Sequence, residues 1–229
     1  TRLQGDWSSD VCSSDLITVM LQFMVTAQQK PYLSAGEKDP KATTILKKAS
    51  DKIKGFSSYE MQFRLTHYLN KSTQKEWPGM YRQAGKKFYF DLDQQLVISN
   101  GKVTWVYLKQ RNEVQLNDAD SDESTMLSPK FFTELYKSKD FVYVLSDNSG
   151  SQYLIDFKPL DKRSSYAKIT LKINKKTNLP AEITVINKDG TRYYFKEILF
   201  APGKKFSDSI FNFNVGKYPG IAVEDLRLE

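Results

Sequence analysis

The feature that most constrains the fold is a two-residue alternation of apolar and polar side chains that recurs along the chain after residue 58. From Tyr59 to Leu69 the odd-numbered positions are apolar or aromatic except for His67, and most of the even-numbered positions are polar. This period is typical of a β-strand that buries one face. The same alternation returns at residues 88–92, 96–98, 103–107, 141–145, 153–157, 169–173, 183–185 and 193–195.

Turn residues separate these runs. Asn100-Gly101 and Asp189-Gly190 provide the positive φ angles that tight hairpins need, and residues 147–150 form a slightly longer turn. Short strands joined mainly by hairpins predict a meandering antiparallel sheet. A sheet of this size must curl. We find no domain boundary and no convincing internal repeat in this part of the chain.

Two helices are predicted to cover the concave face of the sheet. The first begins at Asp39-Pro40, where Asp accepts a free amide hydrogen bond and Pro occupies a position whose N–H has no partner. It ends at Gly55, and its apolar residues recur at helical spacing: Ile45, Leu46, Ala49 and Ile53. The second begins at Ser128-Pro129, and its apolar side consists of Phe131, Phe132 and Leu135.

The N-terminal residues are interpreted as foreign to the fold. Residues 1–16 show no apolar period, and residues 10–16 (DVCSSDL) resemble the translation of a common sequencing adapter. We interpret this segment as an assembly artefact; the alternative is a genuine disordered tail without function. It contains the only cysteine, Cys12, so residues 28–229 have no disulfide and no thiolate ligand.

An export signal is expected directly behind it. Residues 17–27 are apolar, too short to span a bilayer, and end in Val25-Thr26-Ala27, a site of the kind that signal peptidase cuts. We interpret them as a truncated signal peptide, residues 28–38 as a flexible N-terminus and residues 39–229 as a single domain. No cysteine follows Ala27, so no lipid-attachment site is expected in the mature chain.

The charge of the chain is compatible with an anionic partner. The formal net charge of +7 becomes +9 without residues 1–27, which contain one base and three acids. The bases are scattered among acids, with only short pairs such as Lys86-Lys87 and Lys204-Lys205. A solvated basic surface is therefore the simpler interpretation.

No catalytic motif stands out. The single histidine, His67, follows the apolar phase of its strand, which is typical of a packed core residue, and no second histidine offers a metal site. The chain has no Gly-x-Ser-x-Gly turn and no glycine-rich phosphate loop. Residues 118–123 (DADSDE) lack the glycine and the closing glutamate of a calcium loop. We expect no enzyme, no metal and no cofactor.

Large apolar side chains are abundant instead. The chain contains 14 Phe, 13 Tyr and 3 Trp. In a closed small barrel they would simply fill the interior. In an open barrel covered by helices they would line a cavity for acyl chains, and each buried CH₂ would contribute about 0.8 kcal/mol.

The middle of the chain resembles the outer-membrane lipoprotein carrier (LolA) family. The similarity is carried by the hairpin Asn100-Gly101-Lys102, followed by Trp105 and Tyr107. It extends to a strand expected to begin at Gly79, to Lys87-Phe88-Tyr89-Phe90, to Val114-Gln115-Leu116, to the helix start Leu127-Ser128-Pro129, and to the endings Ile210-Phe211-Asn212-Phe213 and 218–225. The resemblance implies a mainly β fold with α-helices: an open, unclosed antiparallel β-barrel with a helical lid on its concave face.

The resemblance also implies a function. The protein would be a periplasmic chaperone for protein transport in a Gram-negative cell. It would take acylated lipoproteins from an inner-membrane release complex, shield their acyl chains in a hydrophobic cavity and deliver them to an outer-membrane acceptor. It would act as a monomer that contacts membrane proteins transiently and binds no nucleic acid.

The residues expected to line the cavity follow from strand phase. They are Met61, Phe63, Leu65, Phe88, Phe90, Leu96, Ile98, Trp105 and Tyr107 on the sheet, with Phe131, Phe132 and Leu135 on the lid. Strand phase alone does not say which face is concave, so the alternates Tyr89, Val97 and Val106 stay open.

One departure from the family concerns the lid. Carriers of the family usually have an Arg-Pro in the strand after the first glycine, and that arginine is implicated in holding the lid closed. Residues 81–85 (YRQAG) occupy this part of the sequence instead. Arg82 is not at the position of the family's arginine, so we do not assign it a role in holding the lid closed. An alternative function is a periplasmic sensor or regulator domain of the same fold that binds a lipid or a partner protein; a basic β-module for nucleic acid is a third.

Overall fold

The computed structural model describes residues 37–69, 72–119 and 134–227. The chain forms two units, Thr1–Pro31 and Tyr32–Glu229, and all of the described residues belong to the second. This part contains the α-helix α1 (Pro40–Lys54) and the short 3₁₀ helices η1 (Leu135–Lys137), η2 (Asp208–Phe211) and η3 (Val215–Lys217). Its strands are β1 (Ser58–Leu69), β2 (Ser72–Ala84), β3 (Lys87–Leu92), β4 (Gln95–Ser99), β5 (Val103–Leu108), β6 (Glu113–Asp118), β7 (Phe141–Asp147), β8 (Gln152–Pro159), β9 (Tyr166–Asn174), β10 (Pro180–Asn187), β11 (Arg192–Pro202) and β12 (Ala222–Asp225).

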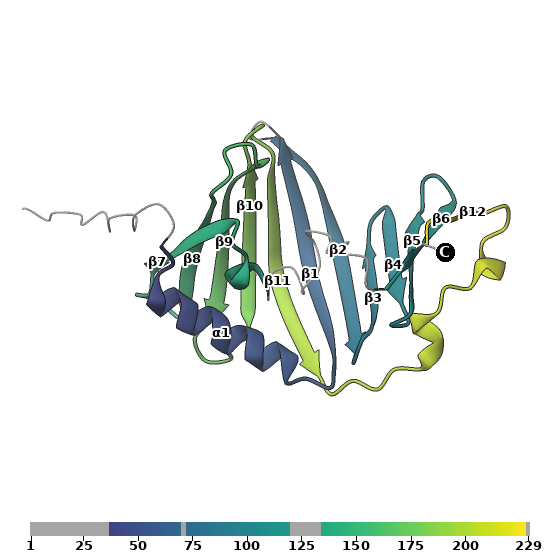
Figure 1. Ribbon diagram of the computed structural model, residues 1–229, viewed down its shortest axis with the longest axis horizontal. Helices are drawn as coiled ribbons and strands as arrows, with labels where there is room; N and C mark the ends of the chain where they lie inside the picture. The colour runs from purple at the N-terminus through teal and green to yellow at the C-terminus, as the bar shows by residue number, and fades with distance from the viewer. Residues whose placement is uncertain (1–36, 70–71, 120–133, 228–229) are drawn as a thin grey trace, which may run out of the picture. The chain divides into compact units, whose positions relative to one another are not determined.

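The strands form one sheet that does not close. Its order is β12-β6-β5-β4-β3-β2-β1-β11-β10-β9-β8-β7, so β12 and β7 are the edges (Figure 1). Every neighbouring pair is antiparallel except β12 and β6, which run parallel. The expected open, mainly antiparallel architecture is confirmed.

The two faces of the sheet have different coverings. We call the face that carries Met61 and Phe63 the inner face, and the opposite face, which carries Gln62 and Arg64, the outer face. Helix α1 lies across the inner face in Figure 1. Its buried side chains share one core with those of β7 to β11: Ala42, Leu46, Ala49 and Ile53 with Phe141, Tyr143, Leu145, Ile155, Phe157, Ile169, Leu171, Ile173, Ile183, Val185 and Phe195.

Hydrogen bonds of Asp39 connect the start of α1 with the edge strand β7. One of its carboxylate oxygens accepts hydrogen bonds from the backbone N–H of Lys41 (2.8 Å) and Ala42 (3.3 Å), as the sequence predicts for a helix cap. Its second carboxylate oxygen accepts from the N–H of Leu145 (3.0 Å), and its own N–H donates to the carbonyl of Tyr143 (3.1 Å). These bonds also protect part of an exposed sheet edge.

Asp39→Ala is therefore expected to lower the free energy of unfolding by about 2–3 kcal/mol, because it removes a helix cap and leaves the Leu145 N–H without this acceptor. Asp51→Ala is the control: Asp51 is exposed on the same helix and pairs with Lys47, a contact worth under about 0.5 kcal/mol. Urea unfolding of both variants measures the difference. Equal losses would contradict the double role of Asp39.

The chain after β11 returns over the outer face. Phe211 and Phe213 are buried there, and the ring of Phe213 stacks on that of Tyr218 with centroids 4.9 Å apart. This segment packs on the outer side of β4 to β6 in a second apolar cluster that contains Leu96, Ile98, Tyr107, Val114 and Phe213. Strand β12 then pairs with β6 at the edge of the sheet.

Strand β2 begins earlier than the sequence predicts. The strand expected to begin at Gly79 begins at Ser72 instead, because Trp77, Pro78 and Gly79 continue the pairing with β1. Pro78 is tolerated because β3 pairs with β2 only from Gly79 onward. The helix expected from Ser128 lies mostly on residues that the structure does not describe. In the described ranges, no helix is both long and apolar enough to cross a membrane.

Candidate functional site

A row of apolar side chains crosses the inner face. Cross-strand pairing places Phe200, Met61, Tyr81, Phe90, Val97 and Val106 side by side on six consecutive strands. All except the half-buried Phe200 are buried. A second row contains Phe195 and Leu65 with Trp77 beside them. The inner face thus carries a continuous band of apolar side chains, most of them buried, that spans both halves of the sheet.

Aromatic contacts join these rows. The ring of Phe63 stacks on that of Phe90, with centroids 6.3 Å apart, and lies 5.6 Å from that of Phe195. The ring of Tyr81 stacks on that of Phe88 at 6.0 Å. Neighbouring rings of this kind stabilise one another beyond their buried area.

The structure divides the nine predicted sheet residues between the two faces. Met61, Phe63, Leu65, Phe88 and Phe90 lie together on the inner face. The other four (Leu96, Ile98, Trp105 and Tyr107) lie on the outer face, under the C-terminal segment.

The prediction of one shared surface for all nine is therefore wrong. Its cause is the turn at Asp93-Gln94, which pairs Phe90 with Val97 rather than with Leu96 or Ile98. Of the alternates, Val97 and Val106 belong to the inner face and Tyr89 to the outer face.

The predicted lid is described only at its end. Phe131 and Phe132 lie outside the described residues. Leu135 is buried in η1 and belongs to the main core, so its place on the inner side is clear, whereas its lid role stays a prediction.

Two lysines at the ends of α1, Lys38 and Lys54, bond to residues in and beside η1. The sequence did not single them out. Lys38 donates to the carbonyls of Tyr136 (3.0 Å) and Ser138 (2.6 Å). Lys54 and Lys137 both pair with Glu134, at 2.5 and 2.8 Å. The contacts of Lys38 and Lys54 join residues far apart in the sequence and have no local sequence motif, whereas the Lys137–Glu134 pair lies within three residues.

His67 is part of the aromatic packing of the inner face. Its half-buried ring stacks between those of Tyr193 and Trp77, with centroids 5.0 and 6.4 Å away. No group of three metal-ligating side chains occurs among the described residues. This geometry agrees with a packing role for His67.

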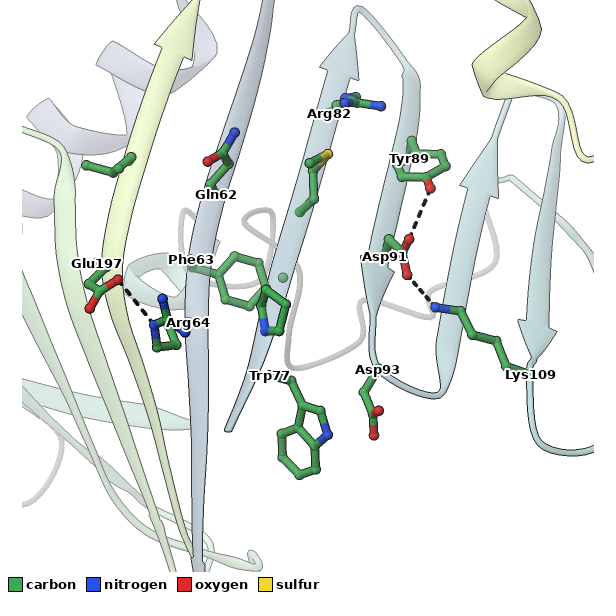
Figure 2. Close-up of a pocket in the computed structure, with 14 residues that line it drawn as sticks. Gln62, Phe63, Arg64, Trp77, Arg82, Tyr89, Asp91, Asp93, Lys109 and Glu197 are labelled. Carbon is green, nitrogen blue, oxygen red and sulfur yellow. Dashed lines mark hydrogen bonds and ion pairs between the residues drawn. The ribbon is translucent and has the colours of Figure 1, made fainter. Parts of the chain in front are cut away.

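A depression of about 730 Å³, lined by both apolar and charged side chains, lies near the place where β2 and β3 part (Figure 2). Arg64 in it pairs with Glu197 (3.2 Å) and Glu76 (3.0 Å), and Lys109 pairs with Asp91 (2.6 Å). Asp91 also accepts from the hydroxyl of Tyr89 (3.2 Å), and burial is the largest of the causes that raise the pKa of Tyr89 to about 12. The three bases of the depression, Arg64, Lys109 and Arg82, are each paired with a carboxylate, whereas Asp93, which also lines it, makes no salt bridge with a described residue.

The match to known proteins fits this geometry. Residues 70–214 match the family described as outer membrane lipoprotein carrier protein LolA. The chain belongs to the LolA family. A search of curated proteins finds no match.

One solved structure supports the fold assignment, and two others are similar at lower TM-scores. An uncharacterised conserved protein from Thermus thermophilus has a TM-score of 0.52 at 12% identity, over 81% of this chain and 99% of that one. A LolA superfamily protein from Nitrosomonas europaea has a TM-score of 0.38 at 13% identity, over 75% and 97%. The Pseudomonas aeruginosa MucA/MucB complex gives 0.36 at 13% identity, over 76% of this chain and 61% of the matched chain.

Within this LolA-family chain, Arg82 does not face the lid side. It projects to the outer face, bonds to Glu60 at 2.8 Å, and lies over the rings of Tyr89 and Phe206. The hydrogen bond from Arg82 is the main cause of the lowered pKa of the Glu60 carboxyl. Arg82 is thus engaged on the opposite side of the sheet from α1.

Two buried phenols on the inner face of this LolA-family chain, those of Tyr59 and Tyr81, are hydrogen-bonded and neutral. The hydroxyls of Tyr59 and Tyr81 both donate to the side-chain carbonyl of Gln83, at 2.9 and 3.2 Å. Burial raises the pKa of both phenols. Both therefore stay protonated at neutral pH, which keeps this end of the inner face uncharged.

Proposed function

We propose that the protein carries the acyl chains of lipoproteins on the inner face of its open sheet. The observation that carries the proposal is the continuous apolar row from Met61 to Val106 in a chain of the LolA family. Burial of each CH₂ contributes about 0.8 kcal/mol, so several acyl chains provide enough driving force without ATP. The acyl-binding residues on the sheet are Met61, Phe63, Leu65, Phe88, Phe90, Val97 and Val106.

The remaining parts of the proposal follow from the family and from the N-terminal sequence. The carrier works in the periplasm after cleavage behind Ala27. It receives acylated lipoproteins from an inner-membrane release complex and passes them to an outer-membrane acceptor. It acts as a monomer and uses neither a cofactor nor catalysis.

Tryptophan fluorescence tests the acyl site, because Trp77 and Trp105 lie on different faces. Trp77 pairs with Leu65 and stacks on His67, whereas Trp105 packs in the outer cluster. In a chain with Trp7 and Trp105 replaced by Phe, a triacylated lipopeptide is expected to shift the emission of Trp77. The same peptide without acyl chains is expected to leave it unchanged.

The matched control keeps Trp105 and replaces Trp7 and Trp77 by Phe. Its emission is expected to stay constant, because the acyl chains do not reach the outer face. A response from Trp105 with none from Trp77 would place the ligand on the wrong face and overturn the proposal.

A further inference from the structure

One end of the sheet gathers several exposed lysines. Antiparallel pairing brings the start of β1, the end of β11, and the β2–β3 and β4–β5 turns to this end. The N–H of Gly85 donates to Ser57 (3.2 Å), and that of Gly203 donates to Ser58 (2.9 Å). A Cβ placed on Gly101 would lie only 3.3 Å from the Cβ of Lys86. The neighbouring turns thus form one surface. We call its exposed lysines, together with Lys52 near the end of α1, the basic end: Lys52, Lys86, Lys102, Lys204 and Lys205.

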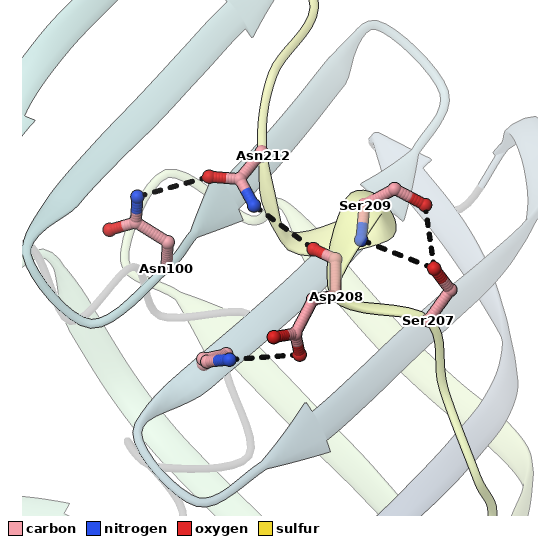
Figure 3. Close-up of polar contacts among 6 residues, drawn as sticks. Asn100, Ser207, Asp208, Ser209 and Asn212 are labelled. Carbon is pink, nitrogen blue, oxygen red and sulfur yellow. Dashed lines mark hydrogen bonds and ion pairs between the residues drawn. The ribbon is translucent and has the colours of Figure 1, made fainter.

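The C-terminal segment fixes two of these turns. The side-chain amide of Asn100, in the β4–β5 turn, donates to the side-chain oxygen of Asn212 at 3.1 Å (Figure 3). The ammonium group of Lys87, beside the β2–β3 turn, donates to the carboxylate of Asp208 at 2.9 Å. The side chain of Asn212 in turn donates to the carbonyl of Asp208 (3.0 Å). The spacing of the lysines is therefore set by the fold.

The basic end carries a net positive charge among the described residues. All five lysines are exposed, and none makes a salt bridge with another described residue. Three acids lie nearby: Asp208 pairs with Lys87, Glu60 pairs with Arg82, and Asp118 lies across from Val103, beside Lys102. This distribution differs from the depression on the outer face, where opposite charges alternate.

The absence of an apolar anchor indicates the kind of partner. Specific protein interfaces contain a buried apolar centre. The large apolar residues at the basic end, Phe56 and Phe206, are half-buried within the fold, and none of the exposed large apolar side chains among the described residues comes from these turns. Clustered lysines without such a centre suit a surface of dense negative charge, such as anionic phospholipid headgroups.

We propose that the basic end contacts the anionic surface of a phospholipid bilayer. Each lysine near such a surface strengthens the partition coefficient about fivefold, and the attraction falls off within a Debye length of roughly 8 Å. The contact needs no acyl ligand, so it goes beyond the carriage of lipoproteins. It would hold the carrier at the bilayer while acyl chains enter or leave.

Sedimentation of the full chain with vesicles tests the contact. Vesicles that contain phosphatidylglycerol are expected to bind the protein, and vesicles of phosphatidylcholine alone are expected to bind far less. Lys86→Glu/Lys204→Glu is expected to weaken partition into the anionic vesicles by at least about 30-fold. About 0.5 M salt should remove most of the binding by the unmodified chain.

The control carries the same change in charge at the opposite end of the sheet. Lys162 and Arg163 are exposed in the β8–β9 turn, and Lys162→Glu/Arg163→Glu is expected to keep most of the binding. The apolar residues 17–27 are present in all variants, so any contribution that they make to vesicle binding does not affect the comparison. Equal binding to both vesicles, or equal losses in both double variants, would overturn the proposal. The absence of binding to either vesicle would overturn it as well and favour an acidic protein as the partner. No lipoprotein is present, so this outcome is separate from that of the acyl-binding test.

Discussion

Phe90→Glu is expected to weaken the binding of a triacylated lipopeptide by more than about tenfold, because it places a charge where the acyl chains should lie and an unpaired buried charge is costly. Phe90 is buried in the middle of the inner row, between Tyr81 and Val97. The affinity is measured by titration of protein whose circular dichroism spectrum shows that it is folded.

Ile98→Glu is the matched control for this substitution. Ile98 is also buried and lies one strand away, but it belongs to the outer cluster under the C-terminal segment. It should lower the free energy of unfolding and loosen that segment while the folded fraction binds lipopeptide normally. Phe88→Glu, at a half-buried inner position, keeps the test available if Phe90→Glu does not fold. Equal losses of affinity on both faces would contradict an inner-face site.

Local chemistry predicts the elements of this fold but not the faces of every strand. The Asp39 cap and the hairpin at Asn100-Gly101 are encoded within a few residues, and the structure contains both. In β4, by contrast, Leu96, Val97 and Ile98 are all apolar and all buried, so the alternation does not identify the inner face. The assignment depends on the register set by the turn before β4, which strand periodicity does not contain.

Long-range contacts account for the remaining differences. Trp77-Pro78-Gly79 looks like a break in a strand, yet β1 continues to pair with it. The second role of Asp39, its bond to Leu145, joins residues more than one hundred positions apart. The hydrogen bonds from Lys38 to the carbonyls of Tyr136 and Ser138 span a similar separation in the sequence. Such bonds carry no signal in a local pattern, because donor and acceptor groups of these types occur throughout the chain.

Gly79→Ala is expected to destabilise the protein by about 1–3 kcal/mol, although glycine to alanine within a strand usually stabilises by about 0.5–1 kcal/mol. The reason is the ring of Phe63, which lies over Gly79 in the adjacent strand. A Cβ at Gly79 would be 2.2 Å from Cζ and 2.3 Å from Cε2 of that ring. The ring has little freedom to move, because Phe63 is buried and packs against Phe90 and Phe195.

A double-mutant cycle with Phe63→Ala tests this cause. Phe63→Ala alone should cost about 3–5 kcal/mol, but Gly79→Ala in its background should then be neutral or stabilising, since the ring that it displaces is gone. Gly150→Ala is the control, because a Cβ at Gly150 meets nothing within 4 Å. Chemical unfolding of the four proteins of the cycle gives the coupling energy. Additive effects would show that the ring of Phe63 does not require glycine at position 79. Strong coupling would mean that Gly79 leaves room for this aromatic ring on the inner face, where acyl chains are proposed to bind.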